Sequence, residues 1–155
     1  MYFARFYLLL WLALCVVAPQ SHAQTLYAIL AVDNRATTDI GNGCNADLYR
    51  MDARLEEAAR AIDYRYVKKR IDDKRFHSDN LLRVLGEVNP GPKDVLMVYI
   101  SSHGQNTEVE KWPCVKLING CFKVSSLHQR ARKQQAGLTM TIADCCNQLR
   151  KPAVA

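Results

Sequence analysis

A histidine and two adjacent cysteines are the residues of this chain best suited to covalent chemistry. His103 is followed by Gly104, and further along the chain Asp144 precedes Cys145 and Cys146. A thiolate is a strong nucleophile, and an imidazole that accepts the thiol proton makes this form available near neutral pH. The backbone amides of Gly104 and Cys146 could donate to the oxyanion of an attacked carbonyl. The pattern therefore indicates acyl transfer, with one of the two adjacent cysteines as nucleophile and His103 as base.

Each of these residues also has an ordinary structural explanation. A histidine at the end of a strand commonly bonds a neighbouring carbonyl, and a cysteine is commonly a small core residue. For His103 or Cys146 taken alone, we consider the structural explanation the better one. Their joint position after two predicted strands favours the catalytic explanation.

Two apolar segments must bring this histidine and this cysteine together. Residues 95–100 are apolar throughout, which predicts a central strand that ends shortly before His103. Residues 138–143 predict another strand, which ends just before Asp144. Sites in open parallel sheets form at the carboxyl ends of the strands, so we expect the dyad at that edge.

The rest of the chain alternates between strand and helix patterns. Residues 25–32 predict a buried strand, residues 35–45 a loop, and residues 64–71 an edge strand. Three helices are predicted. The first faces the sheet with Leu48, Met51, Leu55, Ala58 and Ile62. The second is capped by Ser78 or Asp79, and the third runs from Ser125 or Ser126 to about Ala136. A hairpin turning at Asn119-Gly120 is predicted as an appendage. This order predicts an α/β fold, a three-layer αβα sandwich with a mainly parallel sheet.

The first 23 residues have the pattern of a secretory signal peptide. Arg5 is followed by the apolar residues 6–17 and by Ser21-His22-Ala23, which suits cleavage before Gln24. The apolar run is too short for a stable membrane anchor, and the bulky Leu14 disfavours lipid attachment at Cys15. We therefore expect one exported domain over residues 24–155, in the periplasm or outside the cell.

The charge of the chain is moderately basic, with a formal value of +6. The basic residues have no interleaved aromatic residues, so they predict a solvated surface and no nucleic-acid interface. Gly41-Asn42-Gly43 lacks the spacing of a phosphate loop, which disfavours a nucleotide-binding domain.

The cysteines leave an odd number of thiols after signal cleavage, because Cys15 is one of six. Cys114 and Cys121 could bridge around the hairpin, although sequence does not determine connectivity. A vicinal Cys145–Cys146 disulfide that silences the site is a weaker alternative. His77, His128 and the cysteines lack zinc-ligand spacing, so we predict no metal and no cofactor, and nothing indicates calcium activation.

Together these motifs resemble the catalytic core of caspase and metacaspase cysteine peptidases, in particular bacterial caspase-like proteins. The resemblance runs from Leu26 to Asn147, which would be the N-terminal, large-subunit part, and it includes the helix start Gly43-Cys44-x-x-Asp47. It implies that Cys146 is the nucleophile, His103 the general base and acid, and Gly104 an oxyanion donor.

Asp144 and Asp47 are the candidate substrate-binding residues. Caspases that cleave after aspartate carry Gln-Ala-Cys, and Asp144 stands at the position of that glutamine. A carboxylate there would repel aspartate and pair with a cation, which predicts cleavage of protein or peptide substrates after Arg or Lys. Asp47 is the second candidate for this pocket. Its alternative role is a carboxylate favoured by the dipole at a helix N-terminus.

The chain also departs from the family pattern. Asn147-Gln148-Leu149 replace the usual His-Ser-Gly after the nucleophile, and the family sheet continues with two further strands. We therefore expect a domain truncated after the strand that precedes the nucleophile. The alternative function is an inactive interaction module whose open sheet edge pairs with another chain.

Overall fold

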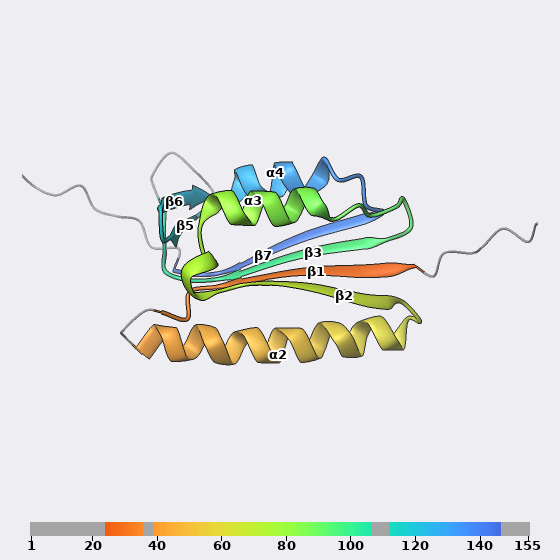
Figure 1. The fold of residues 1–155 in the computed structure, drawn as a ribbon, viewed down its shortest axis with the longest axis horizontal. Coiled ribbons are helices and arrows are strands. Elements are labelled where there is room, and N and C mark those ends of the chain that lie inside the picture. The colour runs from red at the N-terminus through yellow and green to blue at the C-terminus, as the bar shows by residue number, and fades with distance from the viewer. Residues whose placement is uncertain (1–23, 36–38, 107–111, 147–155) are drawn as a thin grey trace, which may run out of the picture.

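The computed structural model describes residues 24–35, 39–106 and 112–146. Its main sheet is four-stranded and parallel, with the order β2-β1-β3-β7. The strands are β1 (Thr25–Val32), β2 (Arg65–Ile71), β3 (Val95–Ser101) and β7 (Leu138–Asp144). Helix α2 (Asp39–Ala61) covers one face, while α3 (Ser78–Glu87) and α4 (Val124–Arg132) cover the other (Figure 1). The predicted three-layer α/β fold is confirmed.

Some predictions fall on residues that the structure does not describe. The predicted signal peptide at residues 1–23 lies outside the described residues, as do Asn147, Gln148 and Leu149. Among the described helices, none is long and apolar enough to cross a membrane.

The central strands β1 and β3 hold the two halves of the core together. On β3, Leu96, Val98 and Ile100 belong to the core beneath α3 and α4, whereas Met97 and Tyr99 belong to the core beneath α2. This alternation follows from the period of two in a strand. Ser101 follows Met97 and Tyr99 in this alternation, so its side chain lies on the face of the sheet that α2 covers, at the carboxyl end of β3.

Strand β7 lies at the edge of the sheet within the described residues. It pairs with β3 in a parallel register that sets Ser101 beside Asp144. Leu138 and Met140 remain 50% and 40% exposed on this strand. The predicted neighbours, the strand before His103 and the strand before Cys146, are therefore adjacent.

The predicted starts and ends of the helices needed correction. Helix α2 begins at Asp39, so the predicted loop at residues 35–45 is mostly helix. Ala59, rather than Ala58, is buried against the sheet, and Ile62 lies beyond the helix and is 52% exposed. The register of a 3.6-residue repeat explains this shift, because Leu48 and Leu55 already define the inward face.

The other two helices also differ at their ends. Ser78 is the first residue of α3, and neither Ser78 nor Asp79 is its cap, a position held by His77. The Asn119 side chain caps α3 from the hairpin, accepting from the Ser78 amide at 3.0 Å. Helix α4 ends at Arg132, before the predicted Ala136. The chain then turns toward β7 through Gln135, whose φ is +58°.

The hairpin is part of the core, which corrects its prediction as an appendage. It comprises β5 (Cys114–Leu117) and β6 (Gly120–Lys123), and β4 (Gly104–Gln105) adds a third antiparallel strand. The turn is Ile118-Asn119, one residue earlier than predicted, because Leu117 pairs with Gly120. Val115 and Leu117 are buried against α3 and α4, so the hairpin fixes the segment that follows His103.

Candidate functional site

The carboxyl ends of β3 and β7 border a cavity of about 330 Å³ that lies beside the first turns of α2. We call it the thiol cavity, and it is lined by Ile40, Gly43, Cys44, Asp47, Ser101, Ser102, Asp144, Cys145 and Cys146. It contains Cys146, the predicted nucleophile, and both predicted substrate-binding carboxylates. Residues far apart in the sequence therefore meet at the predicted edge.

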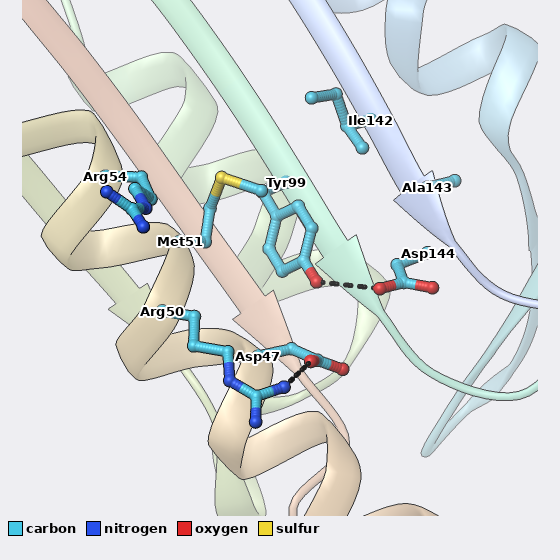
Figure 2. A pocket seen from close by; sticks show the side chains of 8 residues that line it. All are labelled: Asp47, Arg50, Met51, Arg54, Tyr99, Ile142, Ala143 and Asp144. Atoms are coloured by element: carbon cyan, nitrogen blue, oxygen red, sulfur yellow. Dashed lines mark hydrogen bonds and ion pairs between the residues drawn. The ribbon is translucent and has the colours of Figure 1, made fainter. Parts of the chain in front are cut away.

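A second cavity adjoins the first through shared residues. We call it the arginine cavity, and it is lined by Asp47, Arg50, Met51, Arg54, Tyr99, Ile142, Ala143 and Asp144 (Figure 2). Asp47 and Asp144 line both cavities. The two carboxylates therefore stand at the boundary between the thiols and the arginines.

Asp47 approaches the site from helix α2. Because α2 begins at Asp39, Asp47 lies well inside the helix, and its alternative role at a helix N-terminus is wrong. The Ser101 hydroxyl donates to Asp47 Oδ2 at 3.4 Å. Arg50 Nη1 lies 3.7 Å from Asp47 Oδ1, and the Asp47 side chain is 31% exposed. This carboxylate is accessible to a ligand.

Asp144 approaches from the end of β7 and is held by a tyrosine. The Tyr99 hydroxyl donates to Asp144 Oδ2 at 3.1 Å (Figure 2). Burial and the negative charge of Asp144 raise the pKa of Tyr99, so the hydroxyl stays protonated and remains a donor. The bond orients the Asp144 carboxylate through a donor that carries no charge.

The segment that carries the two cysteines packs against Gly104. Cys146 is exposed, whereas Cys145 is half-buried against the core beneath α3 and α4. A Cβ on residue 104 would lie 2.6 Å from the Cys146 carbonyl oxygen and 2.7 Å from Cys145 Cβ. These separations are shorter than van der Waals contact, so only glycine fits between the two segments.

His103 lies on the turn between β3 and β4 and is exposed. Its carbonyl accepts from the Lys116 amide at 2.8 Å, and the Ser102 hydroxyl donates to the Lys116 carbonyl at 2.6 Å. The Ser102 amide donates to the Asp144 carbonyl at 3.2 Å, which ties this turn to the end of β7. In the described part of the chain, no hydrogen bond joins the His103 imidazole to the Cys146 thiol. Catalytic hydrogen bonds in unliganded enzymes often form only with substrate.

Cys44, Tyr99 and Ser101 are among the residues that line the two cavities but were not predicted from the sequence. Burial raises the pKa of the Cys44 thiol, a hydrogen bond with Ser101 lowers it, and nearby carboxylates raise it, so the net shift is upward. Cys44 is therefore a poor nucleophile near neutral pH. The signal for Tyr99 and Ser101 was the two-residue period of β3, which places both on the α2 face.

Within the described residues there is one disulfide, between Cys114 and Cys121. The sequence left the disulfide connectivity open, and the structure pairs the two cysteines that flank the hairpin turn. Cys145 and Cys146 are free thiols. Within the described ranges, no group of three or more His, Cys, Asp or Glu residues is arranged to hold a metal ion.

Comparison with known proteins bears on both fold and family. Residues 29–154 match the family model described as "Caspase domain", and no curated protein matches the chain. The structure is similar to the crystal structure of protein GSU0716 from Geobacter sulfurreducens, with a TM-score of 0.58 and 17% identity. The alignment covers 79% of this chain and 50% of that one, so the chain spans about half the length of this solved protein. At this identity the similarity concerns the fold alone.

Proposed function

The chain belongs to the caspase domain family, a family of cysteine peptidases, and from this premise we propose that it is an endopeptidase that cleaves proteins after Arg or Lys. In this proposal Cys146 is the nucleophile and His103 is the general base and acid. Asp47 and Asp144 bind the side chain of the residue before the scissile bond.

The observation that carries the proposal is the position of two carboxylates beside the candidate nucleophile. Asp47 from α2 and Asp144 from β7 line one cavity with Cys146. Carboxylates form short, charge-assisted hydrogen bonds with guanidinium and ammonium groups. The same pair of charges disfavours an acidic side chain. A basic residue is therefore the ligand that fits the charge of this cavity.

The proposed reaction proceeds through a thioester. Cys146 Sγ attacks the substrate carbonyl carbon while His103 accepts the thiol proton, and His103 then protonates the departing amine. Water hydrolyses the thioester, which returns the thiol. The amides of Gly104 and Cys146 would stabilise the oxyanion, and such a donor typically contributes on the order of 3 kcal/mol. The packing of Gly104 against Cys146 supports this step, because it brings the two segments together.

Active-site labelling tests the proposal. A peptidyl arginine chloromethyl ketone should alkylate the wild-type protein at Cys146, and Cys146→Ala should abolish the labelling. Cys145→Ala is the matched control, because Cys145 is the adjacent thiol and is half-buried in the core. Peptide mapping by mass spectrometry identifies the alkylated residue, and an aspartyl reagent of the same length measures the preference for a basic residue.

Two outcomes would contradict the peptidase proposal. Labelling that survives Cys146→Ala would place the reactive thiol elsewhere. A well-folded protein that is not labelled at all would favour the alternative function, an interaction module that uses the open edge of β7.

Export to the periplasm or the extracellular space is part of the same proposal. The Cys114–Cys121 disulfide supports it, because disulfides persist in oxidising compartments.

A further inference from the structure

Helix α2 carries a guanidinium beside the proposed substrate pocket. Arg50 Nη1 lies 3.7 Å from Asp47 Oδ1, and the Arg50 side chain is 79% exposed. In Figure 2 the Arg50 guanidinium points toward the Asp47 carboxylate, and Asp144 lies across the cavity with Tyr99. The protein therefore holds, at its own pocket, the chemical group that the pocket is proposed to bind.

The two carboxylates of the pocket differ in the charge of their partners. Asp47 forms its ion pair with Arg50, and its other partner is the neutral Ser101 hydroxyl. Asp144 is bonded by the neutral Tyr99 hydroxyl. A basic substrate side chain would therefore meet one carboxylate already paired with a cation and one that is bonded by a neutral hydroxyl.

We propose that Arg50 is an internal competitor of the substrate, a specificity-determining residue that weakens the hold of the pocket on basic side chains. This inference rests on the proposed function. When a substrate guanidinium enters, Arg50 must release Asp47 and swing into solvent. Its high exposure makes this release easy, because an exposed ion pair is held only weakly and its guanidinium is readily solvated. The competition therefore tunes affinity without closing the site.

Benzamidine is a suitable probe, because this small amidinium binds without any catalytic step. We expect Arg50→Ala to tighten benzamidine binding by roughly three- to five-fold at low salt, the range that an exposed ion pair supports. Arg50→Lys should bind benzamidine like the wild type, because it keeps the competing charge. Isothermal titration calorimetry measures the dissociation constants.

Arg60→Ala is the matched control on the same helix. Arg60 is also 79% exposed and also lies 3.7 Å from its partner, Glu56, but it does not line the pocket. The control removes the same charge and the same kind of ion pair, and we expect it to leave benzamidine affinity unchanged. A gain shared by Arg50→Ala and Arg60→Ala would reflect overall charge and would overturn the inference.

A double-mutant cycle tests whether the effect acts through Asp47. With Asp47→Asn in place, Arg50→Ala should no longer tighten binding, because the competing pair is already lost. The gain from Arg50→Ala should also shrink in about 0.5 M NaCl, where exposed charges are screened. A full gain that persists in the Asp47→Asn background would overturn the inference.

Hydrolysis of an arginyl peptide substrate provides a second readout. Arg50→Ala should lower KM by the same factor and leave kcat unchanged, because Arg50 does not touch the reacting atoms. Tighter benzamidine binding without any hydrolysis would leave the role of Arg50 standing and count against the peptidase. Equal benzamidine affinity in wild type and Arg50→Ala, or no binding to either, would overturn the inference.

Discussion

Gly104 packs so closely against Cys145 and Cys146 that the Cβ of any other residue at this position would clash with them. The Cys146 carbonyl oxygen and the Cys145 side chain both lie within 2.7 Å of the position that a Cβ would take. Because Gly104 directly follows His103, this contact sets how closely the proposed base and the proposed nucleophile can approach. The absence of a side chain is thus a geometric requirement of the site.

We predict that Gly104→Ala pushes the two segments apart. The chloromethyl ketone should label this variant at least about ten-fold more slowly, and overpacking should cost about 1–3 kcal/mol of unfolding free energy. Gly86→Ala is the control, because Gly86 lies in α3 and a Cβ added there would have nothing within 4 Å. It should be neutral or stabilising by up to about 1 kcal/mol. Urea denaturation and labelling rates check both, and unchanged labelling in Gly104→Ala would contradict the prediction.

At the scale of elements, a buried carboxylate links the end of β2 to the next turn. Asp72 is 3% exposed and lies between Arg70 Nε and Arg75 Nη2, each 2.5 Å from one of its oxygens. Burial alone would raise the pKa of Asp72, but the hydrogen bonds from Arg75 and Arg70 outweigh it and hold the pKa below its ordinary value. The carboxylate therefore stabilises the folded state in its ionised form.

Asp72→Asn should destabilise the protein in a pH-dependent way. We expect a loss of about 2 kcal/mol in unfolding free energy near neutral pH, since the bonds that Asp72 accepts come from charged donors. A lowered pKa contributes stability that is complete above the unfolded-state pKa and is lost as pH falls through the folded-state pKa. The gap between wild type and variant should therefore narrow below about pH 4. Urea denaturation between about pH 3 and pH 7 measures the difference in unfolding free energy between wild type and variant. Asp63→Asn, at an exposed carboxylate, is the control. A difference that does not change with pH would contradict the role given to the Asp72 carboxylate.

At the scale of the whole molecule, the state of the cysteines bears on the proposed export of the protein. Among the cysteines that the structure describes, Cys114 and Cys121 form a disulfide and Cys44, Cys145 and Cys146 are free thiols. The fold thus separates the disulfide that cross-links the hairpin from the three thiols that line the thiol cavity. An oxidising compartment can form the first without consuming the others.

The mature protein isolated after export should begin at Gln24 and keep this division of cysteines. Under denaturing conditions without reductant, Ellman's reagent should titrate the three free thiols, Cys44, Cys145 and Cys146. Reduction should add the two thiols of Cys114 and Cys121. Edman sequencing and the thiol count check this outcome. Retention of residues 1–23, or no increase in thiols on reduction, would contradict it.

The sequence by itself determined the strands of the main sheet and the edge at which the candidate site lies. Continuous apolar runs predicted β1 and β3, because a strand buried on both faces needs apolar residues at every position. The alternation of strands with helices predicted parallel pairing, which brings the residues after β3 and β7 to one edge. The resemblance to the caspase family also made Asp144 and Asp47 candidates, since motif position is a property of the sequence.

Only the tertiary structure decided which side chains meet at that edge. The register of β7 against β3 sets Asp144 beside Ser101 and within reach of the Tyr99 hydroxyl, and the packing of α2 against the sheet brings Asp47 to the Ser101 hydroxyl. The burial of the hairpin and the contact of Gly104 with the cysteine segment likewise depend on packing between distant segments. Periodicity is a local property and shows which face a residue occupies. The partner of that residue depends on how separate elements are rotated and shifted against each other, and this is set when the core packs.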